Sequence, residues 1–215
     1  MKTALFDLDG TLIDSRADLA LAINLTRQDF DLAPVPVATV VAAIGEGIRV
    51  LLARTIPERA DRLDALLERQ RAHYGAHFLD NTVLYPNMAC VLRTLNARGW
   101  KLGVVTNKPA PFTRPLLEGL GILSCFDAVI GGGDCPRLKP DPAPLRLAAE
   151  RMGTALDAAD WMIGDHFTDL DAAANAGINS CFCRFGFGEQ RASAFTAAVD
   201  TPDELLGVLL AGDGP

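Results

Sequence analysis

The sequence has no apolar stretch that approaches the length of a membrane-spanning helix, and its first residues lack a signal-peptide layout. Internal repeats and low-complexity tracts are also absent. The five cysteines are odd in number and lack the spacing of metal sites. Cys181 and Cys183 would point to the same face of a strand, which does not favour a bond between them. We therefore expect a cytoplasmic protein with reduced, buried thiols and no membrane partner.

Basic residues are scarce relative to acidic ones. The chain has 20 Lys and Arg against 27 Asp and Glu, for a net charge of −7 and a pI near 4.9. Nucleic acids and anionic membranes are polyanions, so this balance argues against both as main partners. A small phosphate ester needs only local positive charge, and it remains compatible with the composition.

Length and hydrophobicity favour a folded enzyme-sized unit. The chain has 215 residues, of which 49% are hydrophobic. This is enough for a sizeable core, and it predicts one large domain or one domain with a small insert.

The first part of the chain predicts one strand followed by a helical insert. The apolar run over residues 3–6 is typical of a buried strand, and Gly10 breaks it. Ser15 can cap a helix over residues 15–30, and further helical patterns lead to Gly45, begin near Ile48 and cover residues 57–79. We expect residues 15–81 to form an all-helical cap, inserted into a core made of residues 1–14 and 82–215.

From Pro86 onward, helix and strand patterns alternate. Helices are expected over residues 88–98, 109–120, 142–152 and 168–176, and strands over 101–105, 126–130, 160–163 and 178–183. Such alternation predicts an α/β fold with a doubly wound, mostly parallel sheet and helices on both faces. Ligands of such sheets bind outside the carboxyl ends of the strands.

The pentapeptide Asp7-Leu8-Asp9-Gly10-Thr11 directly follows the first strand. Two carboxylates leaving a buried strand repel each other, and a divalent cation with oxygen ligands would compensate them. Their alternating directions allow them different tasks. The alternative is an acidic turn without chemistry.

Other strand ends deliver groups of complementary chemistry. The strand at 101–105 is followed by Thr106, Asn107 and Lys108, and the strand at 160–163 by Asp165 and Asp169. Lys139 lies between them, before a helix. Each residue alone has a structural explanation, as a helix cap, a solvated lysine or a helix-terminal acid. Together they supply what phosphoryl transfer requires.

This set of residues resembles the haloacid dehalogenase-like phosphohydrolases. Their four motifs correspond to Asp7-Leu8-Asp9-Gly10-Thr11, Val105-Thr106-Asn107, Lys139-Pro140, and Gly164-Asp165 with Asp169. The phrases AIGEGIRVLL, LYPNM, VVTNKP, RLKPDPAPL and RFGFGE further resemble the phosphoglycolate phosphatase branch with a small helical cap. The resemblance extends from residue 3 to about residue 210.

The resemblance implies roles for the two leading carboxylates. Asp7 would attack phosphorus and form an aspartyl-phosphate, while Asp9 would act as general acid and then general base. Mg²⁺ would be held by the carboxylates of Asp7 and Asp165 and by the backbone carbonyl of Asp9.

It also implies roles for the surrounding residues. Thr106 and the backbone N–H of Asn107 would bind phosphate oxygens, and Lys139 would neutralise charge beside the nucleophile. Asp169 would orient Lys139 or a metal-bound water, and Thr11 would support the turn.

Two features depart from the family pattern or carry weaker signals. His166 and Thr168 differ from the residues usual in the fourth motif, and His166 is interpreted either as a partly exposed turn residue or as a contact to the leaving group. In the cap, Gly47 and Arg49 would help to choose the leaving group, with Arg49 pairing a carboxylate, unless Arg49 is simply solvated.

His73 and His77 have a zinc-like spacing. No third ligand accompanies them, so a metal role is not expected.

We therefore predict a Mg²⁺-dependent phosphomonoesterase, acting on 2-phosphoglycolate, as a monomer or homodimer. The alternatives are a phosphatase for another small sugar phosphate or amino-sugar phosphate, a phosphomutase, or a non-catalytic phosphometabolite-binding protein on the same fold.

Overall fold

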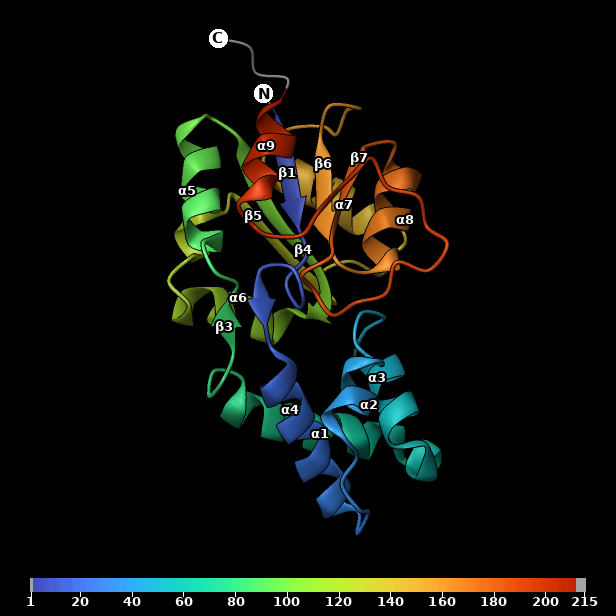
Figure 1. Cartoon of the computed structure of the whole chain (residues 1–215). Coiled ribbons are helices and arrows are strands. Elements are labelled where there is room, and N and C mark those ends of the chain that lie inside the picture. The colour runs from blue at the N-terminus through green and yellow to red at the C-terminus, as the bar shows by residue number, and fades with distance from the viewer. Residues whose placement is uncertain (1, 212–215) are drawn as a thin grey trace.

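A six-stranded parallel sheet forms the centre of the larger unit in the computed structural model, which describes residues 2–211 (Figure 1). Residue 1 and residues 212–215 of the expected core lie outside the described residues. The strand order is β5-β4-β1-β6-β7-β8. The strands are β1 (Thr3–Phe6), β4 (Lys101–Pro109), β5 (Ala128–Gly132), β6 (Trp161–Gly164), β7 (Asn179–Cys183) and β8 (Ala197–Val199).

Side chains alternate between two cores on opposite faces of this sheet. In β1, Ala4 and Phe6 join one hydrophobic cluster while Leu5 joins the other. All three are fully buried. Because both faces of the strand are covered, its sequence is continuously apolar rather than alternating.

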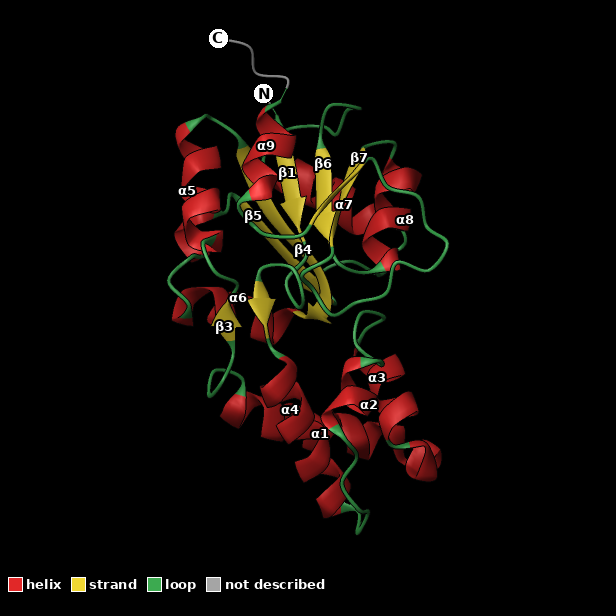
Figure 2. Cartoon of the chain, in the orientation of Figure 1, coloured by secondary structure: helices red, strands yellow, loops and turns green. Residues whose placement is uncertain are grey.

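Helices cover both faces, as the chain pattern predicts (Figure 2). Buried residues of α5 (Met88–Ala97), α6 (Ala110–Gly119) and α9 (Glu204–Leu210) belong to the first cluster. Buried residues of α7 (Ala143–Arg151) and α8 (Phe167–Ala176) belong to the second. A short 3₁₀ helix, η2 (Leu123–Cys125), precedes β5. The predicted α/β fold class is therefore confirmed.

A second, helical unit lies at the carboxyl ends of the sheet strands and has its own core (Figure 1). It consists of α1 (Arg16–Asp29), α2 (Val37–Val41), α3 (Ile48–Thr55), η1 (Pro57–Arg62) and α4 (Leu63–His77). We call this unit the cap; its expected boundaries at residues 15 and 81 stay a prediction. Among residues 2–211, no helix is long and apolar enough to span a membrane.

Two chain crossings connect the cap to the core. They pair as short antiparallel strands, β2 (Ile13–Asp14) and β3 (Val83–Leu84). Asp18, fully buried in α1, accepts hydrogen bonds from the backbone N–H groups of Asn81 and Thr82 and from both of their side chains. This carboxylate therefore fastens the outgoing helix to the returning chain.

The local predictions need several corrections. The helix expected over 57–79 is divided into η1 and α4, because the backbone at Arg62, where the two meet, is not helical. The strand expected over 101–105 continues to Pro109. The two-residue strands β2 and β3, and the C-terminal β8 and α9, were not predicted. Of the cysteines, Cys181 and Cys183 are buried as expected, whereas Cys125 and Cys135 are only partly buried and Cys90 is exposed.

Candidate active site

Asp7 belongs to a buried cluster of charged side chains at the carboxyl end of β1. The Nζ atom of Lys139 lies 3.0 Å from Asp7 Oδ1 and 2.6 Å from Asp169 Oδ1, and it donates to the carbonyl of Val105 at 2.6 Å. Burial opposes the charge on Lys139, but the carboxylates of Asp169 and Asp7 outweigh it and raise the pKa of Lys139. Lys139 is therefore an ammonium ion that compensates both acids.

Asp165 completes this cluster from the end of β6. Its Oδ2 accepts the backbone N–H groups of Phe187 and Gly188 at 2.9 and 2.7 Å. Burial, together with the charges of Asp7 and Asp169, raises the pKa of Asp165 well above its usual value. Gly10 has a φ of +84°, and a Cβ there would overlap the Asp165 carboxylate, so this close approach requires glycine.

The acidic cluster has the donor chemistry of a divalent cation site. Carboxylate oxygens of Asp7, Asp165 and Asp169 lie within 4.8 Å of one another. Asp7 Oδ1 is buried and has no hydrogen-bond partner. The side chain of Asp9 is not part of the cluster. All ligand atoms of the acidic cluster are carboxylate oxygens, which suits Mg²⁺.

Asp9 lies in a separate polar group with residues from the cap and from β4. Lys108 Nζ lies 3.0 Å from both carboxylate oxygens of Asp9, and Ser15 Oγ donates to Asp9 Oδ1 at 2.5 Å. The same ammonium lies 4.4 Å from the ring centroid of Tyr74. Burial disfavours the charge on Lys108, but Asp9 outweighs it and raises the pKa of Lys108. The expected helix cap by Ser15 was wrong, since its side chain makes no capping bond.

Thr106 and Asn107 lie within the extended β4, next to Asp7. The Thr106 hydroxyl accepts the Lys108 N–H at 3.2 Å, so it does not cap a helix. The Asn107 side chain accepts the Lys139 N–H at 2.8 Å and donates to the carbonyls of Lys139 and Gly45, both at 2.9 Å. Asn107 thus connects the sheet, the lysine segment and the cap.

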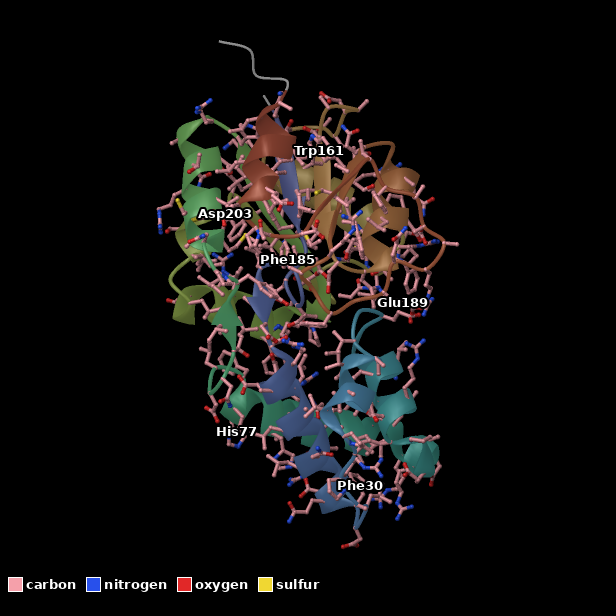
Figure 3. All side chains as sticks on the ribbon, viewed as in Figure 1. Phe30, His77, Trp161, Phe185, Glu189 and Asp203 are labelled. Carbon is pink, nitrogen blue, oxygen red and sulfur yellow. The ribbon has the colours of Figure 1, made fainter. Side chains whose placement is uncertain are left out.

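The cap loop around Gly45 lies against the edge of the core. Figure 3 shows Glu189, in the loop after β7, at the edge that faces this loop. From the same core loop, Arg191 Nη2 lies 3.3 Å from Glu46 Oε1. A Cβ at Gly45 would overlap the His166 ring. These contacts bring the cap over the strand ends.

His166 is buried, which corrects the interpretation as a partly exposed turn residue. It begins α8: its Nδ1 accepts the Thr168 N–H at 3.3 Å, while Asp169 accepts the His166 N–H at 3.1 Å. Burial lowers the pKa of His166 to about 4. The unusual residues His166 and Thr168 therefore form a helix cap with a neutral imidazole.

A cleft between core and cap opens onto both polar groups. It is lined from the core by Asp7, Asp9, Thr106, Asn107, Asp165 and His166, and from the cap by residues that include Gly47, Gln70, Arg71 and Tyr74. Arg49 is exposed and does not line the cleft, so the structure does not bring it to the site. Arg71 is the cap arginine that lines the cleft.

The remaining residues singled out in the sequence lie elsewhere or play a supporting part. Thr11 is buried, and its Oγ1 lies 3.5 Å from Asp165 Oδ1. His73 Nε2 lies 2.6 Å from Asp29 Oδ2, whereas His77 Nδ1 lies 2.8 Å from Asp80. The two histidines therefore contact different acids.

Sequence reasoning gave no role in the site to Lys108, Tyr74 or Arg71, and it gave Ser15 only the role of a helix cap. Strand alternation offered one signal, because Lys108 is two residues after Thr106 and shares its side of the strand. The contact of Tyr74 with Lys108 joins segments far apart in the chain.

The fold agrees with the comparisons to known proteins. The model of the haloacid dehalogenase-like hydrolases matches residues 1–177. The chain therefore belongs to this family of hydrolases, and its relatives place it among the enzymes that hydrolyse phosphoric monoesters.

Individual relatives are similar over most of their length. A phosphoglycolate phosphatase of Rhodospirillum rubrum is 40% identical over 205 residues, covering 91% of this chain and 85% of the relative. One from Escherichia coli is 37% identical, covering 85% and 81%. The crystal structure of a predicted phosphoglycolate phosphatase from Haemophilus somnus superimposes with a TM-score of 0.88 at 30% identity, covering 97% of each chain.

Proposed function

We propose that this hydrolase is a Mg²⁺-dependent phosphatase that acts on 2-phosphoglycolate through an aspartyl-phosphate on Asp7. The observation that carries the proposal is the position of Asp7, which lines the cleft and whose Oδ1 lies 3.0 Å from the Lys139 ammonium. The names of the relatives support the substrate.

In the first step, a carboxylate oxygen of Asp7 attacks phosphorus, and the bond from phosphorus to the ester oxygen breaks. Lys139 holds positive charge beside the attacking oxygen. Because Asp169 also contacts Lys139, at 2.6 Å, the lysine stays fixed while Asp7 is esterified.

Asp9 acts first as general acid and then as general base. The leaving oxygen takes a proton from Asp9, and the Asp9–Lys108 pair regains one from the water that attacks the aspartyl-phosphate. Attack by that water on phosphorus releases inorganic phosphate and restores the Asp7 carboxylate. Ser15 and Lys108 orient the Asp9 carboxylate for both transfers.

The carboxylates of Asp7 and Asp165 would hold the Mg²⁺, with the backbone carbonyl of Asp9. The raised pKa of Asp165 supports this assignment, because a cation would compensate the buried negative charges. Bound Mg²⁺ supplies charge neutralisation for the phosphate oxygens. The Thr106 hydroxyl and the Asn107 N–H would bind the same phosphate group from β4.

Initial rates on a panel of phosphate esters test the proposal. With Mg²⁺ present, we expect 2-phosphoglycolate to give a higher kcat/KM than sugar phosphates, an amino-sugar 6-phosphate or pyrophosphate. Preference for a sugar phosphate would overturn the substrate assignment. No turnover of any ester, with metal binding verified, would favour a phosphometabolite-binding protein.

A further inference from the structure

Two unpartnered polar atoms belong to residues in the cap wall of the cleft. Four buried side-chain nitrogen or oxygen atoms among the described residues have no hydrogen-bond partner: Asp7 Oδ1, Gln70 Nε2, Tyr74 Oη and Tyr85 Oη. The first three belong to residues that line the cleft. Buried polar groups are normally paired, so such a concentration indicates a ligand.

Gln70 presents a donor. Its Oε1 lies 3.0 Å from Thr26 Oγ1, which also lies 2.8 Å from the Ala22 carbonyl. Ala22 is four residues before Thr26 in α1, so its carbonyl already accepts the helical N–H. A carbonyl oxygen can accept a second hydrogen bond, so the Thr26 hydroxyl lies within donating distance of both oxygens. Gln70 Nε2, in contrast, has no hydrogen-bond partner.

Tyr74 lies one helical turn after Gln70 on α4 and presents a hydroxyl. Its ring contacts Phe112 edge-on and lies below the Lys108 ammonium that holds Asp9. Burial raises the pKa of Tyr74 to about 12, so the hydroxyl keeps its proton. It is thus a neutral donor close to the residue that would protonate the leaving oxygen.

Arg71 adds a positive charge to this wall. It is exposed and lines the cleft, and no described acidic side chain pairs with it. The neighbouring Arg69, in contrast, lies 2.6 Å from Asp29 and does not line the cleft. A guanidinium left unpaired in an acidic protein is available to an anionic ligand.

The other side chains of the cap wall are aliphatic. They are Leu19, Ile44, Ile48, Leu51 and Leu67. The cap wall therefore offers donors within a single helical turn and no acidic acceptor. A polyhydroxyl sugar needs acceptors as well as donors, whereas a carboxylate needs only donors.

We infer that Gln70, Arg71 and Tyr74 of α4 form a subsite for the carboxylate of the leaving group, with Arg71 determining specificity. This inference rests on the proposed function and defines its substrate class: phosphate monoesters of short hydroxy acids. Arg71, rather than Arg49, is the arginine that selects them.

The test compares Arg71→Gln with the wild type on 2-phosphoglycolate and on 2-hydroxyethyl phosphate, in which a CH₂OH replaces the carboxylate. We expect kcat/KM on phosphoglycolate to fall about 10- to 100-fold and that on the alcohol less than about twofold. Arg69→Gln is the matched control, because it removes the same charge from the same helix outside the cleft.

Product inhibition gives a second measurement. With p-nitrophenyl phosphate as substrate, Arg71→Gln should raise the inhibition constant of glycolate by a similar factor, while Arg69→Gln leaves it unchanged. Equal losses on both esters, or an unchanged inhibition constant, would overturn the subsite. A wild type that hydrolyses none of these esters would instead overturn the proposed function.

Discussion

The ammonium of Lys139 lies 2.6 Å from Asp169 Oδ1, closer than its 3.0 Å distance from Asp7 Oδ1. Asp169 lies at the start of α8, and Asp7 follows β1, so one lysine connects the end of a strand to the start of a helix. Asp169 accepts the shorter of the two contacts, so a second acid holds Lys139 in place beside Asp7. The Asp7 carboxylate, which lines the cleft, therefore has a fixed positive charge next to it.

Removing Lys139 should damage both stability and activity. In Lys139→Met, Asp7 and Asp169 become neighbouring buried acids without compensation, which costs about 3–5 kcal/mol of unfolding free energy. We expect kcat to fall at least about 100-fold. Urea unfolding and steady-state kinetics measure the two effects.

The double variant Lys139→Met/Asp169→Asn separates the effect on stability from the effect on activity. Neutralising Asp169 should recover much of the lost stability but none of the activity. Recovery of activity in the double variant would show that Lys139 acts only through the fold.

Asp9→Asn should reveal the acid role through the leaving group. With 2-phosphoglycolate, whose alkoxide needs a proton, kcat should fall about 10²- to 10⁴-fold. With p-nitrophenyl phosphate, the leaving group departs without protonation. The rate of the bond-breaking step, measured in a single turnover, should therefore fall much less. Equal losses on both esters would argue against general acid catalysis by Asp9.

Metal removal should abolish turnover reversibly. A chelator is expected to stop hydrolysis and added Mg²⁺ to restore it, because the single Lys139 ammonium does not offset the charges of Asp7, Asp165 and Asp169 together. Mg²⁺ should also raise the Tm of the wild type. Asp165→Asn should lose that shift and should be more stable than the metal-free wild type, since a buried like charge is gone. Metal-independent hydrolysis would refute the site.

The contact between α1 and the returning chain should depend on pH. Hydrogen bonds from Asn81 and Thr82 outweigh the effect of burial, which is the largest single contribution, and lower the pKa of Asp18 from its usual 3.8. The folded state therefore binds this proton more weakly than the unfolded chain, so the stability it contributes is present above pH 3.8 and is lost as pH falls through the folded pKa.

Asp18→Asn should accordingly cost about 1–3 kcal/mol at pH 7, because an amide cannot accept all of these bonds. The difference from wild type should shrink at pH values below the usual 3.8. The exposed Asp61→Asn is the control. A cost that does not change with pH would contradict the role of the ionised Asp18.

The sequence allowed the sheet and the polar strand ends to be predicted, because these follow from local patterns. The buried run over residues 3–6 and the motifs after each strand depend on chain order alone. The contacts of Ser15 and His166 do not follow from chain order alone. Ser15 donates to the charged Asp9 rather than to its own helix, and His166 is buried by the distant Gly45 loop.

The choice between cap arginines likewise needed the structure. Arg49 and Arg71 lie on different helices, and which of them faces the core depends on how α3 and α4 pack. Leu51 and Leu52 enter the cap core, which leaves Arg49 exposed. Sequence alone does not fix that rotation.

Rapid acid quenching with ³²P-labelled substrate tests the central role of Asp7 most directly. After a few milliseconds of turnover with Mg²⁺, peptide mapping should find acid-stable, base-labile phosphate on the peptide that contains Asp7. Asp7→Asn should fold normally, carry no label and show no turnover. Sustained turnover by Asp7→Asn, or label on another residue, would contradict the account.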